Sequence, residues 1–131
     1  MDTHATEITD ANVPARWAWF YQRLRFLRDR LAEARGAHIA VVSESVDSSA
    51  LEFGDSGMAE FDRDMAMGLL KREEDALYEI DAAIRRIVTS SYGICEDTGN
   101  PIPEARLRAI PWTRYTLEAQ ERIEQEDATA S

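Results

Sequence analysis

Residues 17–42, WAWFYQRLRFLRDRLAEARGAHIAVV, carry a regular stripe of apolar side chains. The stripe advances by alternating steps of three and four residues: Trp17, Phe20, Leu24, Leu27, Leu31, Ala34, His38 and Val41. Such steps are the heptad spacing of a helix that packs lengthwise against another helix. Asn12 and Pro14 suit the start of this helix, because Asn caps helices and proline fits a first turn. The stretch therefore predicts a long first helix with a helical partner.

A second long helix is predicted from about residue 58 to residue 89. Its apolar stripe consists of Met58, Phe61, Met65, Leu69, Leu77, Ile80, Ile84 and Ile87. The phase of the stripe shifts near residues 71–76, which predicts a stutter. Residues at about 46–57 are rich in Ser, Asp and Gly and keep no apolar period, so they are the expected tip loop. Two long helices joined by a short polar loop form an antiparallel hairpin, which we place at residues 13–90 after a loose leader at 1–12.

Two glycines interrupt the predicted helices. Gly36 and Gly68 lie almost equally far from the loop centre near residue 52, so they should lie nearly opposite each other. Each costs about 1 kcal/mol relative to alanine in a helix interior. They indicate either tolerated imperfections or a point where the hairpin bends or the helices approach closely. A third alternative is that the first helix ends at Gly36, before the β-branched residues that follow.

The remaining residues, 91–131, predict a small globular end. Residues 90–112, SSYGICEDTGNPIPEARLRAIPW, are dense in Gly and Pro and read as turns with one short helix that begins near Pro103. Thr113 can cap a last helix at about 114–125. The fold class is therefore all-α: a long antiparallel coiled-coil hairpin followed by a small C-terminal region with a terminal helix.

The composition excludes several classes of function. The net charge of −10 opposes binding to nucleic acid and favours basic protein surfaces or the neighbourhood of a bound Mg²⁺. A single cysteine excludes an intramolecular disulfide and a Cys₄ or Cys₂His₂ zinc site. No run reaches the ~18 apolar residues of a membrane span, and the acidic N-terminus lacks the features of a signal peptide, so the default location is the cytoplasm. No nucleophile–base set and no glycine-rich phosphate loop is found, so we do not expect an enzyme.

Three pieces of sequence occur in an order and at a spacing that resemble a known family. They are EIDAAIRRI (79–87), YGICEDTGNPIP (92–103) and RLRAIPWTRYT (106–116). Over residues 55–122 the chain resembles the DksA/TraR family of bacterial transcription factors, and the first helix agrees in character. The resemblance implies a regulator that binds RNA polymerase through its secondary channel, without sequence-specific DNA binding and without a membrane.

The family carries two cysteine pairs that bind zinc, and here the resemblance maps the four ligand positions onto Cys95, Thr98, Thr116 and Ala119. Zn²⁺ needs about four strong nitrogen or sulfur donors, so no metal and no zinc are expected. The degenerate zinc-finger region would then depend on its own packing. An apolar cluster of Ile94, Leu107, Trp112 and Tyr115 is the expected substitute for the metal. Contacts with the base of the helices, including Trp17, Trp19 and Tyr92, are expected to add to it.

The resemblance also places functional residues at the tip of the hairpin. The paired acidic residues of the family fall on Glu52 and Asp55, and the small residue after them falls on Gly57. Carboxylates there can influence Mg²⁺ or pair with basic residues of the polymerase. Alternatively, Asp55 only caps the second helix.

Other expected contacts follow from the same resemblance. Arg106, Arg108 and Arg114 are candidates for docking on the polymerase rim. Guanosine tetraphosphate acts with some family members, but no residue here assigns a site for it. The alternative function is a structural or interaction protein of the same fold that has lost polymerase binding and dimerises through its seam, and the oligomeric state stays open.

Overall fold

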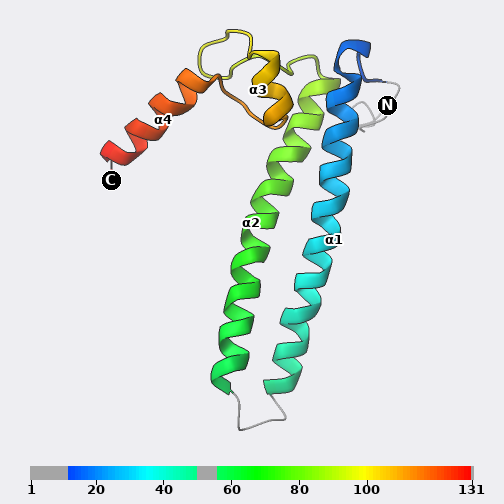
Figure 1. The fold of residues 1–131 in the computed structure, drawn as a ribbon, viewed down its shortest axis with the longest axis vertical. Helices are drawn as coiled ribbons and strands as arrows, with labels where there is room; N and C mark the ends of the chain where they lie inside the picture. The colour runs from blue at the N-terminus through cyan, green and yellow to red at the C-terminus, as the bar shows by residue number, and fades with distance from the viewer. Residues whose placement is uncertain (1–11, 50–55, 131) are drawn as a thin grey trace, which may run out of the picture. The chain divides into compact units, whose positions relative to one another are not determined.

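The structure, a computed structural model, describes residues 12–49 and 56–130. Its elements are the short 3₁₀ helix η3 (Ala15–Trp17) and the helices α1 (Ala18–Ser49), α2 (Ser56–Val88), α3 (Glu104–Ala109) and α4 (Leu117–Ala130). The described part of the chain has no strand, only an isolated bridge between Ile94 and Pro101. Helices α1 and α2 run antiparallel beside each other (Figure 1), so the predicted all-α class and helical hairpin are confirmed. None of the described helices has the length and apolar character needed to cross a membrane.

Helix α1 continues without a break through Gly36 to Ser49, so the alternative in which it ends at Gly36 is wrong. The close-approach alternative is also wrong. A Cβ atom added to Gly36 would meet nothing within 4 Å, and one added to Gly68 would meet only the side chain of Arg72 at 3.8 Å. Helix α1 ends at Ser49 and α2 begins at Ser56, so both helices extend into the stretch at about 46–57 that was expected to be a loop.

The chain divides into two compact units. The head unit comprises residues 1–26 and 79–131, and the hairpin unit comprises residues 27–78. In the head unit eight side chains larger than alanine have at most 2% of their surface exposed: Phe20, Tyr21, Leu24, Ile84, Ile87, Tyr92, Cys95 and Leu107. In the described part of the hairpin unit only Ala66 and Glu73 are buried. The well-packed core therefore belongs to the head unit.

The buried face of α2 differs from the predicted stripe. Ala66, Glu73, Ile80 and Ile87 are buried at intervals of seven residues, which is an unbroken heptad. The predicted phase shift is therefore wrong. Of the stripe residues predicted before the shift, Phe61 and Met65 are 61% and 54% exposed. The spacing of apolar residues located the buried face of α2 wrongly, because two of its buried positions hold an alanine, Ala66, and a glutamate, Glu73.

The seam on α1 matches the prediction for most of its length. Phe20 and Leu24 are buried, and the following seam positions as far as His38 are half-buried. Val41 is 41% exposed, so its place in the seam is wrong. His38 is a packed seam residue, as predicted, with its Nδ1 2.8 Å from Oε2 of Glu73. This contact explains how a glutamate occupies a buried heptad position, since a buried carboxylate needs a partner.

The C-terminal elements follow the prediction with one shift. The short helix after Pro103 is α3. The last helix, α4, begins at Leu117 rather than near residue 114. Its cap is Thr116, whose Oγ1 accepts a hydrogen bond from the amide of Ala119 at 3.3 Å. Thr113, the predicted cap, instead stabilises the preceding turn, where its Oγ1 donates to the carbonyl of Tyr115 at 3.1 Å.

Candidate functional site

The predicted tip residues Glu52 and Asp55 lie outside the described residues. Gly57 falls in the first turn of α2. The site that the structure does describe is the degenerate zinc-finger region of the head unit.

The backbone of this region forms a tight knuckle. The amide of Cys95 donates to the carbonyl of Asn100 at 2.8 Å, and the amide of Ile102 donates to the carbonyl of Gly93 at 2.8 Å. Within the same turn, the amide of Gly99 donates a hydrogen bond to the carbonyl of Cys95 at 2.9 Å. Gly99 has a φ of 76°, which glycine adopts at little cost. Three backbone hydrogen bonds therefore close the knuckle.

The four predicted ligand positions do not form one set of donors. Cys95, Thr116 and Ala119 are buried, with 1%, 9% and 1% of their surface exposed, whereas Thr98 is exposed. The Sγ atom of Cys95 lies 3.9 Å from Oγ1 of Thr116. That hydroxyl already caps α4, and Oγ1 of Thr98 accepts a hydrogen bond from the amide of Asn100 at 3.2 Å. Both threonines thus serve the local backbone.

These residues do not fit a zinc ion. Cys95 offers one sulfur, the two hydroxyls are used by backbone amides, and the methyl group of Ala119 has no donor. Across residues 12–49 and 56–130, no group of three or more His, Cys, Asp or Glu side chains could hold a metal ion.

The two threonines at the predicted ligand positions, Thr98 and Thr116, affect the pKa of the Cys95 thiol. Burial raises the pKa of this thiol, and hydrogen bonds with Thr98 and Thr116 lower it by more, so the net shift is downward. The threonines therefore interact with the sulfur where a metal-binding region would have placed further thiolates.

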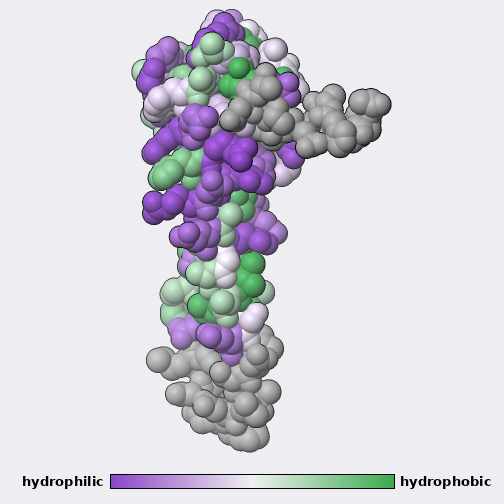
Figure 2. Space-filling view, turned by 90° about the vertical axis from the view of Figure 1, so that its right-hand side faces the viewer, coloured by the Kyte–Doolittle hydropathy of each residue, from purple (hydrophilic) through white to green (hydrophobic). Residues whose placement is uncertain are grey.

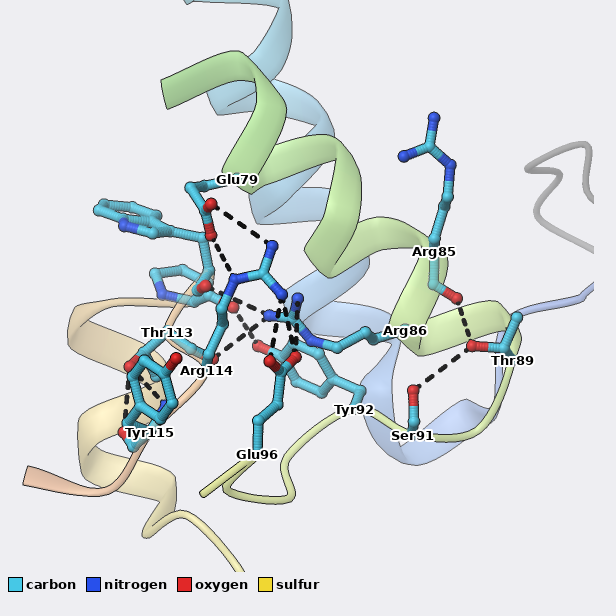
Figure 3. Close-up of polar contacts among 12 residues, drawn as sticks. Glu79, Arg85, Arg86, Thr89, Ser91, Tyr92, Glu96, Thr113, Arg114 and Tyr115 are labelled. Carbon is cyan, nitrogen blue, oxygen red and sulfur yellow. Dashed lines mark hydrogen bonds and ion pairs between the residues drawn. The ribbon is translucent and has the colours of Figure 1, made fainter. Parts of the chain in front are cut away.

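Two arginines connect the knuckle to the end of α2 (Figure 3). Arg86 donates through Nη2 to the carbonyls of Trp112 at 3.2 Å and Thr113 at 3.3 Å. Arg114 donates through Nε to Glu79 at 2.7 Å and through Nη1 to Glu96 at 3.0 Å. Burial lowers the pKa of Arg86, while the hydrogen bond to Glu79 raises the pKa of Arg114. Together the two side chains join α2, the knuckle and the segment before α4.

Aromatic packing completes the head unit. The hydroxyl of the buried Tyr92 donates to the carbonyl of Pro111 at 2.8 Å. Its ring meets Trp17 edge-on, with centroids 4.9 Å apart, and lies 5.8 Å from the ring of Phe20. Gly93, with a φ of 84°, leaves room for Trp17, because an added Cβ would lie 3.0 Å from the indole ring. The predicted contact between the knuckle and the N-terminal aromatic residues is confirmed for Trp17.

The predicted apolar cluster is only partly formed. Leu107 is buried, and Trp112 and Tyr115 are half-buried. Ile94 is 43% exposed, so its place in the cluster is wrong. Ile94 lies in the isolated bridge with Pro101, between the buried residues Gly93 and Cys95, and its own side chain faces outward.

The three predicted docking arginines differ in their surroundings. Arg106 donates through Nε to the carbonyl of Tyr115 at 2.8 Å, and Arg114 is held by its two glutamates. Arg108 is the exposed one, paired with Glu104 at 3.0 Å. Sequence reasoning missed Arg86, although a cation in the last turn of a helix is a known partner for nearby carbonyls.

Comparison with known proteins identifies the family of this region. The profile of the prokaryotic dksA/traR C4-type zinc finger matches residues 90–125. The chain is 31% identical over 109 residues to the RNA polymerase-binding transcription factor DksA of Caulobacter vibrioides, covering 83% of this chain and 76% of that protein. The chain belongs to the DksA/TraR family. The family resemblance predicted from the sequence is therefore confirmed.

Two further proteins show how far the likeness extends. An uncharacterized protein of Aquifex aeolicus is 41% identical over 78 residues, which are 60% of this chain and 54% of that protein. The chain thus spans about half of that relative. The structure of transcription factor DksA2 from Pseudomonas aeruginosa superimposes with a TM-score of 0.77 and 27% identity, covering 95% of this chain and 92% of that one.

Proposed function

We propose that this chain binds RNA polymerase and modulates transcription in the manner of a DksA/TraR regulator. The observation that carries the proposal is the 31% identity to an RNA polymerase-binding factor over 76% of that factor's length. The shared fold with DksA2 supports it. The partner is then a protein of the cytoplasm, and the net charge of −10 suits a basic channel of that partner. We assign no catalytic reaction to the chain.

Within this proposal the hairpin enters the secondary channel and presents Glu52 and Asp55 near the active centre, with Gly57 beside them. The family pattern supports these positions, since all three fall where the family carries its tip residues. Arg108 is the most accessible of the three docking arginines, because its side chain is exposed whereas Arg106 and Arg114 are half-buried. It pairs with Glu104 and lies over the ring of Trp19.

A binding and transcription experiment tests the proposal. Purified chain is titrated against RNA polymerase of its own bacterium, and transcript yield is measured in parallel. We expect specific binding by the wild type and loss of the transcriptional effect in a variant with Glu52→Gln and Asp55→Asn. A matched control removes two carboxylates from α1, Asp29→Asn with Glu33→Gln, and should act like the wild type. Absence of binding at physiological salt would refute the proposal.

We also propose that the head unit folds without zinc. Its support is the mismatch between zinc and the residues at the four ligand positions, together with the hydrogen bonds that close the knuckle. Elemental analysis should find less than one zinc per chain, and a chelator should leave the melting temperature unchanged. The matched control restores the family's cysteines with Thr98→Cys, Thr116→Cys and Ala119→Cys, and this variant should bind zinc. One zinc that survives dialysis of the wild-type chain contradicts the idea.

A further inference from the structure

Exposed apolar side chains gather in the part of the hairpin unit that adjoins residues 50–55. Five of them, each 40% to 61% exposed, define what we name the apolar belt: Ile39, Val41, Phe61, Met65 and Met67. Figure 2 shows green surface in this region, between the purple, charged section of the hairpin and the grey residues. Apolar surface exposed in one section of a protein can mark an interaction site.

The residues of the belt on α2 point in several directions. Met65 and Met67 flank the buried Ala66, so each projects about 100° away from the seam, on opposite sides of the helix. Phe61 lies about 140° from the same seam position and faces away from α1. The belt therefore does not form a single stripe that one flat surface could cover.

The belt residues on α1 lie on the same two sides of the hairpin as Met65 and Met67 of α2. Ile39 follows the seam residue His38 by one position, at about +100°, whereas Val41 lies at about −60°. Because the two helices run in opposite directions, positions that follow the seam on either helix lie on the same side of the hairpin. Ile39 and Met67 thus share one side, and Val41 and Met65 share the other.

The charges around the belt indicate the chemistry of its partner. Among the exposed neighbours are four carboxylates, Glu44, Glu60, Asp62 and Asp64, with Arg63 as the basic residue of the same section. The rest of the hairpin unit, residues 27–36 and 70–78, holds equal numbers of acidic and basic side chains. An apolar surface framed by negative charge complements a cleft that is apolar in part and positively charged.

We propose that the apolar belt is gripped on both sides by the walls of a positively charged protein cleft. This rests on the proposed function, in which the cleft is the secondary channel of RNA polymerase, and it adds which residues contact the walls and how deep the hairpin inserts. The hairpin is enclosed at least as far as Ile39 and Met67, and the charge-balanced section beyond them stays near the rim.

Paired substitutions test the two sides separately. One variant carries Ile39→Gln and Met67→Gln, and the other carries Val41→Gln and Met65→Gln. The matched control is Tyr78→Gln, which removes a side chain that is 66% exposed in the same unit but outside the belt. The dissociation constant for purified RNA polymerase is measured by fluorescence anisotropy, and circular dichroism verifies that each variant keeps its helices.

We expect each pair to weaken binding about tenfold or more and the control to change it less than about twofold. Weakening by one pair alone would overturn enclosure in favour of one-sided docking. Wild-type affinity in both pairs would overturn the inference and leave the proposed function intact, whereas a wild type that does not bind polymerase overturns both. Light scattering that shows a stable dimer, dissociated by the belt substitutions, would assign the belt to a second copy of the chain instead.

Discussion

The head unit and the hairpin unit hold their structures in different ways. The head unit buries eight side chains larger than alanine almost completely, including Leu107 and the aromatic ring of Tyr92. The described part of the hairpin unit buries only Ala66 and Glu73, and it leaves the five residues of the apolar belt exposed. Because buried apolar area is the main favourable term in folding, the head unit is the stable part. The hairpin unit leaves more of its apolar surface exposed.

The largest effect that tests this contrast is a cavity in the head unit. Leu107→Ala removes a side chain that is 1% exposed and should lower the free energy of unfolding by about 3 kcal/mol. Leu70→Ala, at a half-buried seam position of the hairpin unit, should cost only about 1 kcal/mol. Urea denaturation followed by tryptophan fluorescence measures the first change, because all three tryptophans lie in the head unit. Equal losses in both variants would remove the contrast.

The next effect concerns Arg86, which links the end of α2 to the segment before α4. Arg86→Met leaves the carbonyls of Trp112 and Thr113 without their donor, and hydrogen bonds to charged groups contribute about 2 kcal/mol. We expect a destabilisation of that size by urea denaturation. Arg85→Met is the matched control, because it removes the same charge at the neighbouring position, which is exposed. A cost as large in the control would show that charge, and not the two hydrogen bonds, carries the effect.

A smaller effect appears in the pH dependence of the head unit. Burial raises the pKa of Tyr92, although Arg86 lowers it in part. A group with a raised pKa in the folded state contributes stability that is complete below its unfolded pKa, about 10, and is lost as the pH rises above it. The free energy of unfolding should therefore fall above about pH 10. Tyr92→Phe should lose about 1 kcal/mol at neutral pH, from the bond to Pro111, and fall less steeply at high pH. Parallel curves for the two proteins would contradict this assignment.

The heptad spacing predicted both long helices, because a repeat of three and four residues has few other structural meanings. It failed in the hairpin unit, where Phe61 and Met65 are more apolar than the Ala66 and Glu73 positions that are buried. A sequence pattern cannot separate apolar residues that pack inward from those that stay exposed.

In the head unit the family resemblance, which mapped the ligand positions onto Cys95, Thr98, Thr116 and Ala119, predicted the place of the knuckle. The resemblance did not predict the hydrogen bonds of Arg86 that link α2 to the segment before α4. The partners of Arg86 are carbonyls 26 and 27 residues away, and nothing local distinguishes this arginine from the exposed Arg85 beside it. The cap of α4 was also missed, because Thr113 and Thr116 are equally suitable by residue type.

The smallest effects should come from Gly36→Ala and Gly68→Ala in the hairpin unit. Both glycines lie inside continuous helices, and an added Cβ meets nothing at Gly36 and only the flexible end of Arg72 at Gly68. Each substitution should therefore stabilise the helices by up to about 1 kcal/mol, which thermal denaturation followed by circular dichroism measures. If instead the glycines serve bending of the hairpin in its binding cleft, the same variants would be more stable and yet bind polymerase more weakly. Unchanged affinity together with higher stability would show that both are tolerated imperfections.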